Sequence, residues 1–151
     1  GARVVCVSSD AHYGGRVDFD DLDRTRGYFA YRAYATSKLM NLLFVREAAR
    51  RLPTSVAINA QHPGVVASGF GLGDRGLINV WYSVTKPFLK SPTQGADTSV
   101  WLATAPEVDG VTGKYFCRRR EHGMLAAARD DDLARRLWEE SERLTGMTLP
   151  V

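Results

Sequence analysis

The sequence predicts an α/β fold, a parallel sheet with flanking helices, from three observations. Residues 3–7 form a short apolar run whose β-branched side chains favour a strand, and residues 56–59 form a second. Between them, residues 31–51 carry apolar side chains at helical spacing. The 151 residues are 44% hydrophobic and 25% charged, which is enough apolar material for one core. Strand, helix and strand in this order make one right-handed βαβ unit.

The first predicted strand ends at two hydroxyl side chains, Ser8 and Ser9. Ligands of open α/β sheets bind at the carboxyl ends of the strands, so both serines lie where a substrate or cofactor would be. A turn serine that caps the next segment is the alternative. Because the chain starts with Gly1 and the strand begins at once, we expect it to continue something upstream.

Residues 10–29 are polar, with two adjacent glycines and an acidic run at 18–23. They predict a long loop over the mouth of the site, since loops of this length are uncommon unless they are functional or disordered.

The predicted helix at 31–51 carries the pair that points to chemistry, Tyr34 and Lys38. Side chains at i and i+4 lie on one helix face, one turn apart. A neighbouring cation favours the phenolate form of a phenol, which can make a tyrosine a proton donor. Such a pair also occurs by chance on many amphipathic helices, so its position near the helix start, closest to the serines, is what gives it weight.

The rest of the chain predicts a turn, a variable segment and two more helices. Pro63 and Gly64 turn the chain where backbone groups can approach a flat ligand closely. Residues 69–92 combine glycines with apolar and aromatic bulk, which fits either a lid over a hydrophobic substrate or an ordinary core helix. We expect helices at 91–104 and 129–144.

Charge and cysteine content argue against several classes of function. The net charge of +3 is small, and the one tight basic cluster, 118–120, is read as a solvated turn rather than a phosphate contact, so no nucleic acid is expected. Cys6 and Cys117 have no metal-ligand spacing, and we expect buried strand residues, no bridge and no metal. No run reaches the ~18 apolar residues of a membrane span and no signal peptide opens the chain, which predicts a cytoplasmic protein.

In chain order, three strings resemble the second half of a short-chain dehydrogenase/reductase, namely Val4-Val5-Cys6-Val7-Ser8-Ser9, Tyr34-Ala35-Thr36-Ser37-Lys38 and His62-Pro63-Gly64-Val65-Val66. The segment 17–22 and the wide spacing before Tyr34 resemble the retinol-dehydrogenase-like branch. The resemblance implies the C-terminal part of a Rossmann-type doubly wound parallel sheet, with three strands, the last entered at 112–116, and flanking helices.

The resemblance also implies a role for each matching residue. Tyr34 exchanges a proton with the substrate oxygen, Lys38 supports Tyr34, and Ser9 hydrogen-bonds the reacting oxygen. The residues implied in cofactor binding are Tyr34, Lys38, Pro63, Gly64, Val65, Val66 and Ser68. Ser68 stands where relatives usually have a threonine, and His62 is more often a packing residue than a base.

The implied activity is hydride transfer between NADP(H) or NAD(H), with a slight preference for NADP(H), and a small apolar alcohol or carbonyl, retinol-like or other. The nucleotide-phosphate-binding half is absent from the sequence, so 1–151 would be the C-terminal catalytic and substrate-binding half. The expected partner is a second copy or a complementing N-terminal half.

Two alternatives differ in class from an enzyme. The chain could be a truncated or split half-domain that is inactive until a partner chain completes its sheet, since an unpaired strand edge invites association. A cofactor-sensing module without catalysis is disfavoured, because Ser9, Tyr34 and Lys38 are all present.

Overall fold

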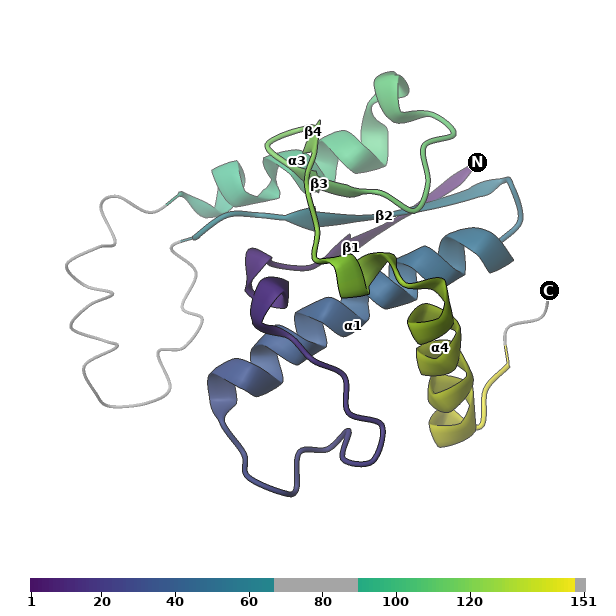
Figure 1. Ribbon diagram of the computed structural model, residues 1–151. Coiled ribbons are helices and arrows are strands. Elements are labelled where there is room, and N and C mark those ends of the chain that lie inside the picture. Colours follow the sequence, from purple (N-terminus) through teal and green to yellow (C-terminus); the bar gives the residue numbers. More distant parts are fainter. Residues whose placement is uncertain (67–89, 149–151) are drawn as a thin grey trace.

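The computed structural model describes residues 1–66 and 90–148 and contains a four-stranded sheet in the order β1-β2-β3-β4 (Figure 1). β1 (Ala2–Val7), β2 (Val56–His62) and β3 (Tyr115–Cys117) are parallel, and β4 (Arg120–Glu121) runs antiparallel to β3. The predicted α/β fold with a Rossmann-type parallel sheet is therefore confirmed.

The prediction of three strands was one short, because it missed β4. Residues Arg118 and Arg119 form the tight turn between β3 and β4 with positive φ angles of 52° and 58°. Tight turns with positive φ angles usually contain Asn-Gly or Gly-Gly, and neither pair occurs at this turn. Arg119 is instead held by an ion pair with Asp97 of α3 (Pro92–Thr104) and by a bond from its N–H to Thr98 Oγ1 at 3.3 Å.

Helices cover both faces of the sheet (Figure 1). α1 (Ala30–Arg51) and α4 (Asp131–Thr145) lie on one face, and α3 (Pro92–Thr104) lies on the other. The main core lies between the sheet and the helices α1 and α4. Its buried residues are Leu39, Leu42, Leu43, Val45, Ala48, Ile58, Ala60, Tyr115, Ala128, Ala134, Leu137 and Trp138. A smaller cluster under α3 consists of Leu102, Val108 and Phe116.

α3 and α4 carry clear end signals in their sequences, although α4 begins two residues after its predicted start at Arg129. Ser91 and Gln94 form a reciprocal capping box at the start of α3, and Pro92 occupies its first turn. Gly146 ends α4 with a φ of 66°, a left-handed conformation that suits glycine. Three short 3₁₀-helices complete the described structure: η1 (Asp10–Gly14), η3 (Pro106–Val108) and η4 (Ala126–Arg129). The predicted loop at 10–29 thus opens with a helical turn.

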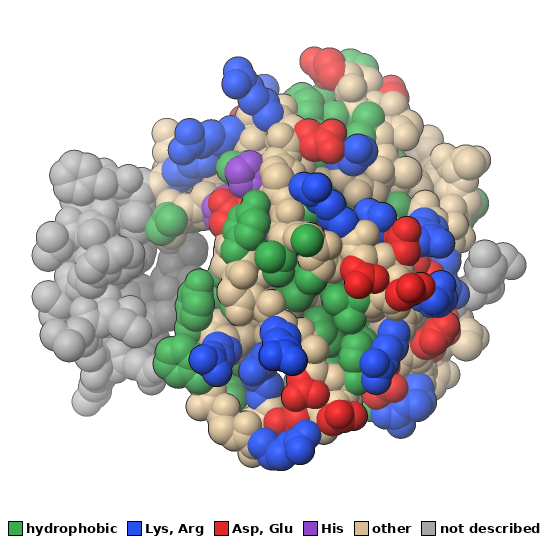
Figure 2. Space-filling model, in the orientation of Figure 1, with side chains coloured by type: hydrophobic (Ala, Val, Ile, Leu, Met, Phe, Trp, Pro, Cys, Tyr) green, Lys and Arg blue, Asp and Glu red, His purple; other side chains and the backbone are tan. Residues whose placement is uncertain are grey.

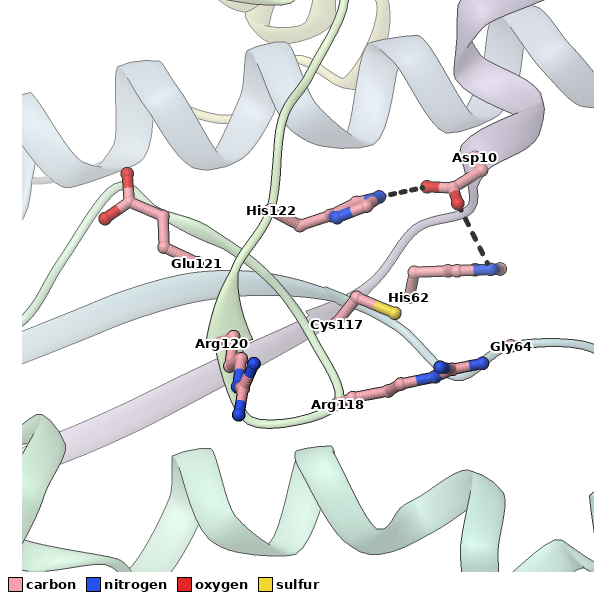
Figure 3. Close-up of a pocket in the computed structure, with 8 residues that line it drawn as sticks. All are labelled: Asp10, His62, Gly64, Cys117, Arg118, Arg120, Glu121 and His122. Carbon is pink, nitrogen blue, oxygen red and sulfur yellow. Dashed lines mark ion pairs between the residues drawn. The ribbon is translucent and has the colours of Figure 1, made fainter.

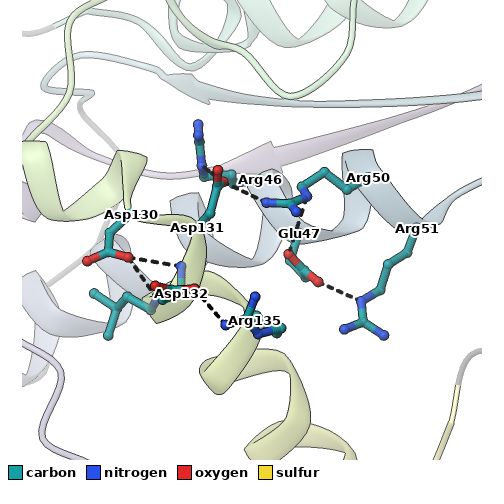
Figure 4. Close-up of polar contacts among 9 residues, drawn as sticks. Arg46, Glu47, Arg50, Arg51, Asp130, Asp131, Asp132 and Arg135 are labelled. Atoms are coloured by element: carbon teal, nitrogen blue, oxygen red, sulfur yellow. Dashed lines mark hydrogen bonds and ion pairs between the residues drawn. The ribbon is translucent and has the colours of Figure 1, made fainter.

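Polar contacts join α4 to α1 (Figure 4). Asp131 pairs with Arg46 Nε at 2.6 Å and with Arg50 Nη1 at 2.8 Å. Asp130 caps α4 by accepting from the N–H groups of Asp132 and Leu133. Because exposed ion pairs contribute little, the apolar contact beneath them is the larger stabilising term.

The surface carries both signs of charge in alternation over the face shown in Figure 2, in keeping with the small net charge. Among helices formed by the described residues, none has the length and apolar character needed to cross a bilayer. Cys6 and Cys117 are both free thiols.

Candidate active site

The pair on α1 lies as its spacing predicts. Tyr34 and Lys38 are half-buried on one face of the helix, and Lys38 Nζ is 5.4 Å from the centroid of the Tyr34 ring. An ammonium at this distance from the centroid is attracted to the face of the ring.

The end of β1 fixes the same helical turn. Lys38 Nζ donates to the carbonyl of Val7 at 3.4 Å, and Asn41 Nδ2 donates to the same oxygen at 3.1 Å. Ser8 is buried, and its hydroxyl donates to the Lys38 carbonyl at 2.8 Å. Side chain and backbone of Lys38 are therefore both tied to the strand that precedes the predicted catalytic serine.

Ser9 is the N-cap of η1, and its Oγ accepts from the Ala11 N–H at 3.2 Å. The sequence allows two interpretations of Ser9, a cap of the next segment or a contact with a substrate or cofactor, and the structure shows the cap. The second role remains open, because a hydroxyl that accepts one bond can still donate its own proton. η1 packs on α1. At Gly15, directly after η1, a Cβ would lie 2.6 Å from the Ala35 carbonyl oxygen, so the serine turn (residues 9–15) sits against the turn of α1 that carries Tyr34 and Lys38.

The turn after β2 is the third part of the site. β2 extends three residues beyond its predicted end, to His62, so Pro63 and Gly64 follow it directly. Gly64 has a φ of 82°, and a Cβ there would lie 2.9 Å from Lys90 Nζ, which donates to the Pro63 carbonyl at 3.1 Å. Val65 is 61% exposed. Val66 pairs with Lys90 in a single parallel bridge. Ser68 and nearly all of the predicted lid at 69–92 lie outside the described residues.

Next to this turn is a cavity of about 440 Å³, shown in Figure 3. Its lining residues are Asp10, His62, Gly64, Cys117, Arg118, Arg120, Glu121 and His122. The Asp10 carboxylate lies between two imidazoles, 3.5 Å from His62 Nε2 and 3.3 Å from His122 Nε2. It also accepts from the Tyr115 hydroxyl at 3.0 Å.

The titratable groups around Asp10 differ in what they can do. Burial and the Asp10 carboxylate raise the pKa of Tyr115 far above its ordinary value, so this phenol stays protonated and serves as a donor. Burial lowers the pKa of His62, although Asp10 opposes the shift. The contact with Asp10 gives the His62 imidazole a polar partner.

The sequence predicted Ser9, Tyr34, Lys38 and the turn at 63–66, and the structure places all four at the carboxyl edge of the parallel strands. Sequence reasoning missed Asp10, which directly follows Ser9, and also Tyr115 and His122, because no local motif marks them. The pairing of β3 beside β2 brings Tyr115 and His122 to Asp10. Within residues 1–66 and 90–148, no three or more His, Cys, Asp or Glu side chains are arranged so that they could hold a metal ion.

Comparisons with known proteins find relatives that are named as dehydrogenases and a ketoreductase. No family model matches. The chain is 42% identical to human retinol dehydrogenase 14 over 97% of its own length and 45% of the relative's. It is 43% identical to a Streptomyces protein named as a daunorubicin C-13 ketoreductase, over 98% of the chain and 50% of that protein.

A crystal structure of an uncharacterized protein from Mycobacterium paratuberculosis superposes with a TM-score of 0.73 at 30% identity, covering 99% of this chain and 52% of the other. The chain thus spans about half the length of the relatives that it matches.

Proposed function

This chain belongs to the short-chain dehydrogenase/reductase family, in its retinol-dehydrogenase-like branch, and we propose that residues 1–151 are the C-terminal catalytic half of such a domain. The proposed reaction is oxidation of an alcohol or reduction of a carbonyl. The observation that carries it is the placement of the Lys38 ammonium 5.4 Å from the Tyr34 ring, against the end of the strand that leads to Ser9.

In this proposal Tyr34 is the general acid in reduction and the general base in oxidation. Lys38 supports it by favouring the phenolate that remains when the proton has left. The Ser9 hydroxyl, on a turn packed against α1, donates to the substrate oxygen as negative charge develops there. The bonds of Lys38 to the end of β1 hold the helix turn and the strand end in one arrangement.

A bound nicotinamide would give or take the hydride. Val65, in the turn that follows β2, offers an exposed apolar side chain against which such a ring could lie. We propose NADP(H) or NAD(H) as the cofactor, with a slight preference for NADP(H), and assign its contacts to Tyr34, Lys38, Pro63, Gly64, Val65, Val66 and Ser68.

We propose a lipophilic alcohol or carbonyl as substrate. The names of several relatives support this class, since retinol and polyprenols are alcohols with long apolar chains.

The test is Tyr34→Phe in the polypeptide as its own cell makes it, assayed by nicotinamide absorbance with retinol or retinal. Loss of the acid/base group should lower kcat by about 10²–10⁴-fold, whereas fluorescence titration should show a much smaller loss of cofactor affinity, because Tyr34 is one of several proposed cofactor contacts. Tyr31→Phe, in the same helix with a side chain that is mostly exposed, is the matched control and should leave kcat unchanged. Undiminished turnover by Tyr34→Phe would remove the assignment.

A second candidate is that the chain is a half-domain that works only with a complementing partner. β1 pairs with β2 on one side and, among the described strands, has no neighbour on the other. Its Val4 and Val7 are 42% and 47% exposed, unusual for a strand in a parallel sheet.

Intact mass measured from the source cell separates the two candidates. A mass near twice 16.7 kDa indicates an upstream half in the same polypeptide. A mass near 16.7 kDa indicates that a second chain must supply the missing strand.

A further inference from the structure

The imidazole of His12 is fully buried in η1 and uses both ring nitrogens. Nδ1 lies 2.7 Å from the Ser9 carbonyl oxygen, and Nε2 lies 3.1 Å from the backbone nitrogen of Leu125. A backbone N–H can only donate, so Nε2 must be the acceptor. Nδ1 therefore carries the single proton of a neutral imidazole and donates it to Ser9. The two contacts together require one tautomer.

Aromatic contacts hold the same ring in place. Tyr13 lies against it with centroids 4.2 Å apart, and Tyr115 meets it edge-on at 5.5 Å. The Tyr115 hydroxyl donates to Asp10, the residue after Ser9. The segment from β3 to Leu125 thus reaches the serine turn twice, through His12 and through Asp10.

We propose that His12 is a positioning residue for Ser9, a neutral imidazole that ties the serine turn to the backbone at Leu125. The proposal rests on the catalytic role given to Ser9 under Proposed function. Its physical basis is that the position of the Ser9 hydroxyl follows from its backbone, and the Ser9 carbonyl is fixed by the His12 side chain as well as by the His12 N–H at 3.0 Å. Misplacement of a reacting group by about 1 Å can cost on the order of 10²-fold in rate.

The tie depends on His12 staying neutral, because a protonated Nε2 would point a donor at the Leu125 N–H. Burial lowers the pKa of His12 and His122 lowers it further, whereas the Ser9 carbonyl and the Asp10 carboxylate raise it. Burial is the largest of these effects, so the ring is neutral near pH 7.

The sharpest test replaces Leu125 by proline, which deletes the N–H and little else of the backbone. Leu125 has φ −53° and ψ 144°, angles that proline adopts, and its N–H is bonded to His12. Leu125→Ala is the matched control, because it shortens the side chain and keeps the N–H.

Nitrogen-15 NMR of the imidazoles is the first readout, and the chain has only three histidines. His12 is assigned as the signal lost in His12→Phe. Wild type and Leu125→Ala should show the neutral Nδ1–H form at pH 7. Leu125→Pro should show mixed tautomers and a higher His12 pKa than Leu125→Ala. Identical spectra for the two Leu125 variants would overturn the proposal.

The second readout is kinetic, in the polypeptide as its cell makes it. Leu125→Pro should have a kcat lower than that of Leu125→Ala by on the order of 10²-fold, with an unchanged KM for the cofactor. If Leu125→Pro does not fold, His12→Phe replaces it, because it keeps an aromatic ring, loses both bonds and should lose kcat to the same extent.

Tyr34→Phe, measured alongside, separates failure of the proposal from failure of the proposed function. Equal kcat in the two Leu125 variants while Tyr34→Phe is inactive would refute the role of His12 alone. An active Tyr34→Phe would refute the proposed function, and the role of His12 with it.

Discussion

Replacing Gly15 by alanine should destabilise the contact between η1 and α1. A Cβ at Gly15 would lie 2.6 Å from the Ala35 carbonyl oxygen and 2.9 Å from Leu39 Cβ. The first is helix backbone and the second is the root of a buried side chain, so neither can move aside cheaply. The φ of Gly15 is −80°, which any residue adopts, so the penalty is steric alone.

Gly14→Ala is a matched control for the size of this penalty. At Gly14 a Cβ would meet nothing closer than 3.5 Å, an ordinary contact with the Tyr31 ring. Both variants change the entropy of the unfolded chain equally, by about 0.4–1 kcal/mol, and that effect cancels in their difference. What remains is the overpacking at Gly15, roughly 1–3 kcal/mol. For a chain of this length the two variants should therefore differ in Tm by about 2–12 °C.

Urea unfolding, followed by tryptophan fluorescence and circular dichroism, measures the free energy of unfolding of both variants. We expect Gly15→Ala to have the lower midpoint with an unchanged m-value. Equal midpoints for Gly15→Ala and Gly14→Ala would refute the close packing of the serine turn on α1.

Three further predictions concern pH, a helix cap and a packing contact. Burial lowers the pKa of His12 in the folded protein, so the contribution of neutral His12 to the free energy of unfolding is fully present above the ordinary histidine pKa of about 6.5. That contribution is lost as the pH falls through the lower pKa of the folded state. Urea midpoints measured between pH 7.5 and 5 should therefore depend less on pH in His12→Phe than in the wild type. Asp130→Ala removes the cap of α4 and should lower the free energy of unfolding by about 1 kcal/mol, measured by thermal unfolding. Asp132 is exposed and lies two residues further along the first turn, so Asp132→Ala should change it by no more than about 0.5 kcal/mol. Equal losses would mean that the cap is not formed. Gly95→Ala places a Cβ 2.5 Å from Val66 Cγ2 and should lower the free energy of unfolding by about 1–3 kcal/mol. Adding Val66→Ala to this variant should restore part of that loss. If the effects of the two substitutions are strictly additive in a double-mutant cycle, the contact is contradicted.

The sequence by itself determined the features that depend on near neighbours in the chain. β-branched runs gave β1 and β2, helical spacing gave α1, and Ser91 with Pro92 marked the start of α3. The relation of Tyr34 to Lys38 was also set locally, since any helix brings i and i+4 together. These choices rest on backbone propensity and periodicity, which a short window of sequence contains.

Only the tertiary structure decided which distant residues surround Ser9. Asp10 meets His62, Tyr115 and His122 because β3 pairs beside β2, and the sequence positions of these four residues span more than a hundred residues. β4 was missed for the same reason, since its tight turn is held by Asp97 of α3 rather than by turn residues of its own. Contacts of this kind depend on strand order and packing, and no local pattern encodes them.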